Sequence, residues 1–171
     1  MTKRFSRRNK NQAGFTLVEL LVVIAIIGVL AAIILPSAYN AIEKSKVAAA
    51  EADYKAIKAA VLNFYADTGK WPPSSGDGQG SNPPDDAYLV TDPEDNNNYP
   101  GWNGPYLDRW PAKNPWGGTY TFKNESSGRY LELDSVPSSA ADRMKADLGD
   151  DVVEISGSGS TRTVKITISK D

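Results

Sequence analysis

The sequence has 171 residues with 19 basic and 21 acidic side chains, and its formal net charge of −2 at pH 7 gives no basic excess of the kind that nucleic-acid-binding domains carry. It contains no histidine and no cysteine, which excludes Ser-His-Asp and Cys-His catalytic systems, zinc sites with nitrogen or sulfur ligands, and disulfide bonds. The length suits one domain with one further segment, and no nucleophile and base are marked by context, so we expect a protein that is not an enzyme.

The N-terminus combines a short basic segment with a long apolar one. Residues 1–13 hold five positive charges and no acid, and Phe15–Leu35 is apolar apart from Glu19. About 20 apolar residues span the hydrocarbon core of a bilayer, and the basic flank should stay cytoplasmic, so the rest of the chain should face outward. A secretory signal is cut after its apolar region. Here the small residue Gly14 precedes that region, so cleavage before Phe15 would leave the apolar helix attached; an ordinary single-pass anchor is the alternative.

This junction resembles the class III leader of type IV pilins and of type II secretion pseudopilins. The resemblance implies cleavage after Gly14 by a prepilin peptidase, N-methylation of Phe15, and assembly of the mature subunits into a helical filament. The residues that carry it are Gly14, Phe15, Thr16, Leu17, Glu19 and Pro36.

Glu19 has two compatible interpretations. Thr16 and Glu19 have the spacing of a capping box, in which each side chain binds the other residue's backbone N–H at a helix start. A charge inside a membrane helix is costly and is usually paired, and cleavage would create an amine at Phe15. The family resemblance favours pairing of Glu19 with the Phe15 amine of a neighbouring subunit. Pro36 cannot donate a backbone hydrogen bond, so we expect a kink near residues 33–36.

The segment that follows, residues 37–67, reads as an amphipathic helix that continues the apolar one. Apolar residues recur at steps of three and four and mark one helix face. Thr68 and Gly69 end the helix, since two prolines follow. The predicted buried face consists of Val47, Ala50, Tyr54, Ile57, Val61 and Phe64.

Residues 68–118 form a long loop region rich in turn formers. Trp71, Trp102, Trp110 and Trp116 all lie in it, and we expect them to be buried against the amphipathic helix, with a ligand-binding platform as the alternative. Acidic side chains there offer the hard oxygen ligands that calcium takes, although their spacing does not match an EF-hand. The weak calcium candidates are Asp92, Glu94, Asp95 and Asp108; no other cofactor is indicated.

The last part, residues 119–171, predicts antiparallel sheet with one short helix. Residues 119–123 and 129–133 flank a turn, and residues 152–156 and 161–169 flank a glycine- and serine-rich turn. Residues 138–148 read as a helix, capped near Ser138 or Ser139 and stopped at Gly149.

Two further blocks extend the resemblance toward the major pseudopilin of type II secretion systems. They are GKWP at Gly69–Pro72 and YLDRWPAKNPWGGTYTF at Tyr106–Phe122, in which Asn114 to Gly117 has the composition of a turn. From Ser135 onward the chain departs from that pseudopilin, which ends in a calcium loop. A surface type IV pilus subunit therefore stays open as an alternative.

These observations give one prediction for the whole chain. The fold is α+β and pilin-like, with a cleaved leader (1–14), a membrane or filament-core helix (15–36), an amphipathic helix (37–67), a loop region (68–118) and an antiparallel sheet with a short helix (119–171). The resemblance implies a pseudopilin subunit that polymerises with itself. It also implies minor pilins or pseudopilins, an inner-membrane assembly platform and its ATPase as partners, and a head outside the inner membrane. A pilus subunit for adhesion or motility and a membrane-tethered ligand-binding adhesin are the alternatives.

Overall fold

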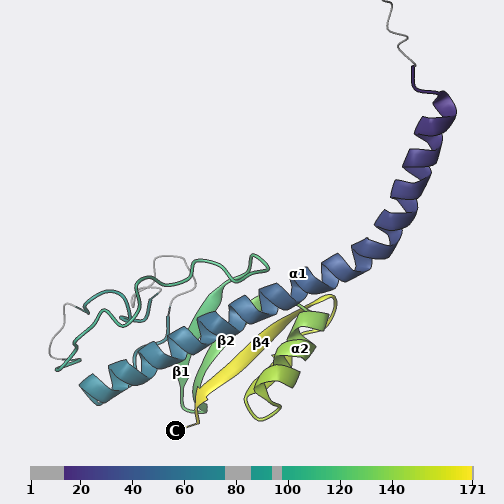
Figure 1. Ribbon diagram of the computed structural model, residues 1–171. Helices are drawn as coiled ribbons and strands as arrows, with labels where there is room; N and C mark the ends of the chain where they lie inside the picture. The colour runs from purple at the N-terminus through teal and green to yellow at the C-terminus, as the bar shows by residue number, and fades with distance from the viewer. Residues whose placement is uncertain (1–13, 76–85, 94–97, 171) are drawn as a thin grey trace, which may run out of the picture. The chain divides into compact units, whose positions relative to one another are not determined.

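A computed structural model describes residues 14–75, 86–93 and 98–170 of the chain. The described residues form two helices and four strands in the order α1 (Leu17–Thr68), β1 (Tyr120–Glu125), β2 (Gly128–Pro137), α2 (Ser138–Leu148), β3 (Val153–Ser156) and β4 (Thr161–Ser169) (Figure 1). The chain divides into two compact units, residues 1–41 and residues 42–171. We call the second unit the head. The predicted α+β architecture, a long N-terminal helix with a small antiparallel sheet, is confirmed.

The N-terminal unit contains the first part of α1 as far as Ala41. The helix continues through Pro36, which lies inside it. The apolar side chains here are exposed; from Leu17 to Leu35 the large ones keep 49% to 74% of their surface accessible. A helix that packs on the core of a soluble domain buries one face, whereas this segment buries none, so it does not pack on a core in this structure.

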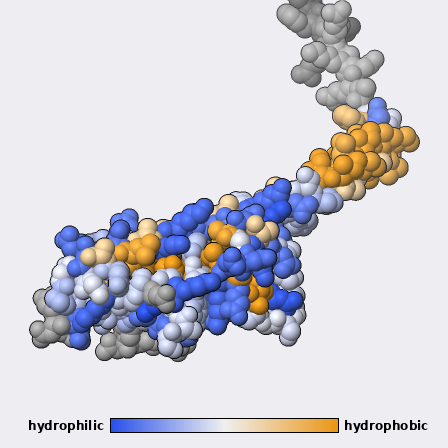
Figure 2. Space-filling view, turned by 90° about the horizontal axis from the view of Figure 1, so that it is seen from below, coloured by the Kyte–Doolittle hydropathy of each residue, from blue (hydrophilic) through white to orange (hydrophobic). Residues whose placement is uncertain are grey.

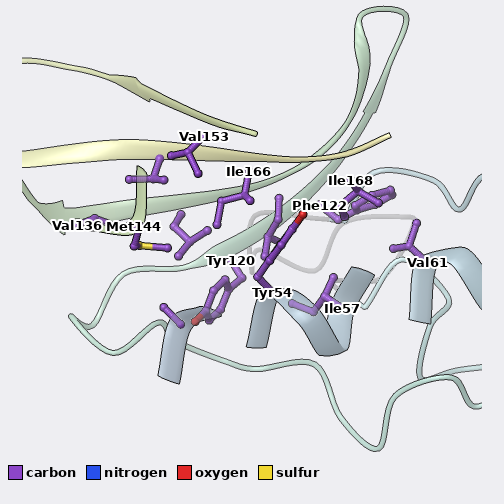
Figure 3. Close-up of a cluster of buried hydrophobic side chains, with 14 of the residues drawn as sticks. Tyr54, Ile57, Val61, Tyr120, Phe122, Val136, Met144, Val153, Ile166 and Ile168 are labelled. Carbon is purple, nitrogen blue, oxygen red and sulfur yellow. The ribbon is translucent and has the colours of Figure 1, made fainter. Parts of the chain in front are cut away.

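In the head, α1 buries the face that its sequence period predicts. Figure 3 shows three residues of this face, Tyr54, Ile57 and Val61, among the side chains of the sheet. The helix ends at Thr68, whose hydroxyl donates to the Phe64 carbonyl over 2.7 Å, and Gly69 follows at a φ of 68°. The predicted face is confirmed in full, and the six predicted residues are at most 4% exposed: Val47, Ala50, Tyr54, Ile57, Val61 and Phe64.

The sheet has the strand order β1-β2-β4-β3 with antiparallel neighbours throughout. Alternate residues of each strand point toward α1 and alternate residues point away, which gives the buried row Val164, Ile166 and Ile168 in β4. Strand β2 runs four residues beyond its predicted end, because an irregularity between Leu133 and Val136 lets the strand resume pairing with β4. The alternation of buried and exposed residues is lost at such an irregularity, so the predicted strand end at residue 133 was wrong.

Helix α2 follows β2 without a loop and covers one end of the core through Ala140, Ala141 and Met144. The predicted serine cap is wrong. Pro137 holds the cap position with no side-chain hydrogen bond, and the Ser139 hydroxyl donates instead to the Glu43 carboxylate of α1 over 3.0 Å. The predicted stop is confirmed at Gly149, which has a φ of 102°.

The described residues between α1 and β1 contain no helix or strand, as predicted for a loop region. Its aromatic side chains pack on the core, as expected, and are half-buried. Tyr99 and Tyr106 meet the Phe64 ring edge-on at 5.2 and 5.6 Å, and Trp71 stacks on Tyr65 at 4.2 Å. The core consists of one sheet packed on one helix, and it is too shallow to bury both faces of aromatic rings of this size.

Candidate functional site

The start of α1 is the first candidate site, and its local geometry is a complete capping box. The Glu19 carboxylate accepts the Thr16 backbone N–H over 2.8 Å through Oε2, and the Thr16 hydroxyl accepts the Glu19 backbone N–H over 3.2 Å. The Thr16 hydroxyl also donates to the same Oε2 over 2.8 Å. The capping interpretation of these two residues is therefore confirmed, because both orphan N–H groups have their reciprocal partners.

The same carboxylate keeps capacity for a further donor. A carboxylate can accept about four hydrogen bonds, and both bonds from Thr16 go to Oε2. Gly14 and Phe15 lie just outside the helix and are exposed, Phe15 to 93% of its surface. The junction that we expect to be cut is thus open to a protease active site, and a new amine at Phe15 would begin one residue before the capping box. No structural observation tests the pairing of Glu19 with a neighbouring subunit, and it stays a prediction.

The apolar segment behind this capping box forms a continuous exposed surface. By length and composition α1 contains one stretch that could cross a membrane, and none of that stretch is buried. Figure 2 shows its apolar side chains gathered together, whereas the visible face of the head is mostly polar with smaller apolar patches. Exposed apolar surface of this extent marks a site of membrane or protein contact.

The head carries a second candidate site, a groove of about 490 Å³ between α1 and residues 107–113. Asp53, Ala56 and Ile57 of α1 form one wall. Asp53 accepts the Tyr120 hydroxyl over 2.7 Å, and burial together with this carboxylate raises the pKa of Tyr120 far above its ordinary value. Sequence reasoning missed this groove, since the basic residues of its other wall, Arg109 and Lys113, looked like ordinary loop charges.

The loop that forms the groove is held by one buried side chain, Asn114. Its Oδ1 accepts the backbone N–H groups of Trp116 and Gly118 over 3.0 and 3.1 Å, and its Nδ2 donates to the Asp134 carbonyl over 2.7 Å. Gly117 adopts a φ of 93°, as the predicted Asn-Pro-Trp-Gly turn requires. Asn114 is 3% exposed and is one of the residues that connect the loop region to the sheet, as Ser75 is through its hydrogen bonds with Phe122.

The calcium candidates are not brought together where the structure describes them. Asp92 and Asp108 are exposed, and Glu94 and Asp95 lie outside the described residues. Among the described residues no group of three acidic side chains is placed to hold a metal ion. The neighbouring Asp86 uses its carboxylate locally, since it accepts the Tyr88 N–H and the Thr91 hydroxyl, each over 2.8 Å.

Comparison with known protein families gives two matches that together cover most of the chain. The prokaryotic N-terminal methylation motif matches residues 9–35, the segment that contains the capping box. The family described as PilW, C-terminal, matches residues 41–137, which is more than half of the chain.

Individual relatives fall into two groups. The chain is 34% identical over 116 residues to the type II secretion system core protein G of Pseudomonas aeruginosa, covering 67% of this chain and 75% of that protein. It is 28% identical over 139 residues to the core protein G of Xanthomonas campestris, covering 80% and 87%. It is 40% identical over 78 residues to the type IV major pilin protein PilE1 of Neisseria gonorrhoeae, and that match covers 46% of this chain and 47% of the pilin.

One solved structure shares the fold. The major type IV pilin PilA1 from Clostridium difficile superposes with a TM-score of 0.52 over 75% of this chain and 97% of that chain, at 21% sequence identity. At this level of identity the likeness concerns the fold: a long N-terminal helix with an antiparallel sheet packed on it.

Proposed function

This chain belongs to the family of type IV pilins and type II secretion pseudopilins, and from that membership we propose that it is a pseudopilin of the major type, the repeating subunit of a type II secretion filament. Members of the family are structural proteins rather than enzymes, and they polymerise after processing by a prepilin peptidase. The proposal adds the kind of filament to what the family implies.

The observation that carries the proposal is the extent of the two groups of matches. Similarity to two core proteins G extends over 116 and 139 residues, which is longer than α1 and includes part of the head. The match to the gonococcal pilin ends after 78 residues, so it covers about half of either protein. The N-terminal segment has the same role in pili and in secretion filaments, so the head is the part that distinguishes them. Similarity that extends further into the head therefore favours the secretion filament.

For the N-terminus we propose the processing and assembly steps that its geometry allows. Cleavage between Gly14 and Phe15 removes the basic leader, the Phe15 amine is methylated, and Glu19 pairs with the Phe15 amine of a neighbouring subunit. Glu19 Oε1 has no hydrogen-bond partner among the described residues, which supports this pairing, because both bonds from Thr16 go to Oε2. Buried ion pairs of this kind fix register more than they add stability.

We further propose an inner-membrane precursor with its head on the outer side, drawn into the filament by a membrane platform and a separate ATPase. The exposed apolar segment supports membrane insertion, and the basic residues before it favour this orientation. Minor pseudopilins are the expected partners at the filament end. Pro36 lies inside the inserted helix, where a missing backbone donor can be tolerated if neighbouring groups satisfy the freed carbonyl.

The experiment is to shear native cells and measure the intact mass of this protein in the sheared and membrane fractions. A chain that begins at Phe15 and stays in the membrane fraction, without surface fibres, is expected for a secretion pseudopilin. The same processed chain in long sheared fibres would instead make it a pilus subunit, the alternative that the departure from Ser135 onward leaves open. A chain that still begins at Met1 in both fractions would refute filament assembly.

Glu19 is tested by replacing it with alanine and measuring the chemically cross-linked multimers of the processed chain in the membrane fraction. Glu19→Ala should still be cleaved after Gly14, because the cleavage junction lies outside the helix, but it should yield few multimers. The matched control is Glu43→Ala, an acid of the same helix whose carboxylate accepts the Ser139 hydroxyl. A normal yield of multimers from Glu19→Ala would remove the proposed pairing.

A further inference from the structure

The groove between α1 and residues 107–113 presents two positive charges that the head does not use. Arg109 and Lys113 line it and are exposed, and neither forms a hydrogen bond or ion pair with another residue in the described part of the chain. Asp53, the acid in the groove, already accepts the Tyr120 hydroxyl. Trp110, which is half-buried, and the buried Ile57 also line the groove. The groove therefore suits an anionic partner with some apolar surface.

The chain carries a surface of opposite charge at the end of α2. Asp147, Asp150 and Asp151 are exposed around the turn at Gly149, and we call these residues the acidic turn. They lie at the negative end of the α2 dipole, which adds to their mutual repulsion. Within the described residues this charge is offset by one ion pair, in which Lys145 lies 3.8 Å from Asp150. An external cation would relieve the remaining repulsion.

The backbone holds the acidic turn in one shape. The Gly149 N–H donates to the Lys145 carbonyl over 3.0 Å, and the Gly149 carbonyl accepts the N–H groups of Val152 and Val153 over 3.2 and 3.1 Å. Gly149 itself has a φ of 102°, a conformation that glycine adopts readily. Binding of a partner to this turn therefore costs little conformational entropy, which favours association.

The two surfaces lie on opposite sides of α1 within the head. Figure 1 shows the loop that leads into β1 along one side of α1 and helix α2 on the other. Subunits that polymerise head to tail use two different faces of each copy, and these faces must complement each other. We propose that the acidic turn of one subunit docks in the Arg109–Lys113 groove of a second copy of this chain. This inference rests on the polymerisation stated under the proposed function.

The small energy of exposed ion pairs limits the role of this contact in assembly. Exposed ion pairs contribute little each and are screened by salt, so the contact orients heads rather than holding the filament together. Helices of the N-terminal segment bury far more apolar surface and would supply most of the assembly energy. The contact should therefore change filament yield and its salt dependence, with cleavage of the leader unaffected.

Cysteine cross-linking tests the contact directly, because the natural chain has no cysteine. The pair Ala112→Cys and Asp151→Cys keeps both cations and two of the three acids. Oxidation of filaments that carry this pair should produce a ladder of covalent multimers. The single variants and the mismatched pair Ala112→Cys with Ser126→Cys, whose second site lies in the exposed β1–β2 turn, should give none.

Charge reversal gives an independent readout. Replacing Arg109 and Lys113 with glutamate should lower filament yield about tenfold, which is 1.4 kcal/mol per contact. Adding lysine at Asp150 and Asp151 should restore the yield. Filaments that form normally but show no ladder from the matched pair would overturn this interface and leave the proposed function standing. If the processed, unaltered chain forms no multimers in either the membrane or the sheared fraction, the proposed function and the interface are both refuted.

Discussion

Replacing Asn114 with alanine tests whether one side chain joins the loop region to the sheet. The side chain makes three hydrogen bonds of 3.1 Å or less, two accepted from Trp116 and Gly118 and one donated to the Asp134 carbonyl. A fourth contact, from Nδ2 to the Thr119 carbonyl, is 3.5 Å long and therefore weak. Each buried hydrogen bond contributes about 1 kcal/mol net, so Asn114→Ala should lower the free energy of unfolding by about 3 kcal/mol.

The assay is urea unfolding of the full chain in detergent micelles, followed by tryptophan fluorescence. Asn63→Ala is the matched control, because Asn63 is exposed on α1 and no hydrogen bond of its side chain is seen among the described residues; it should change the stability by less than about 0.5 kcal/mol. Equal stabilities of Asn114→Ala and Asn63→Ala would refute the reasoning.

Three further changes test the head. Burial and the nearby Asp147 raise the pKa of Glu51, whose Oε1 is buried without a hydrogen-bond partner in the described residues. The ionised carboxylate therefore destabilises the folded state at pH 7. This destabilisation is lost as the pH falls through the raised pKa toward 4.5. Glu51→Gln should therefore be more stable than the natural chain at pH 7 and gain less on going to pH 5; equal pH slopes in urea unfolding would contradict this. Gly118→Ala should destabilise the head by more than about 1 kcal/mol, because the added Cβ would collide with Asp134. The control Gly117→Ala meets no neighbouring atom and strains only the backbone φ of 93°. Tyr120→Phe should cost about 1 kcal/mol through the lost bond to Asp53, with Tyr39→Phe as the exposed control.

Local sequence patterns determined most of the helices and strands. The three-and-four spacing of apolar residues identified the buried face of α1, and strict alternation identified β4, because each pattern follows from the geometry of a single element. Gly149 and the block from Asn114 to Gly117 marked a helix end and a turn for the same reason. The capping box at Thr16 and Glu19 was also readable, since its two partners lie three residues apart.

Features that depend on two distant segments could not be read in this way. The strand order β1-β2-β4-β3, the resumption of β2 after its irregularity, and the Ser139 contact with Glu43 each join residues far apart in the chain. The aromatic loop residues stayed half-buried because the depth of the core, which no local pattern encodes, limits how much of a large ring can be covered.

The sequence by itself predicted a processing junction, and it determined the apolar helix, the family and most elements of the head, because short-range spacing and composition specify each of them. Only the tertiary structure placed Arg109 and Lys113 beside α1 and placed the acidic turn on the opposite side of α1. Charges along a chain do not reveal which face they share. That depends on how loop, sheet and helices pack, and packing is a property of the whole head.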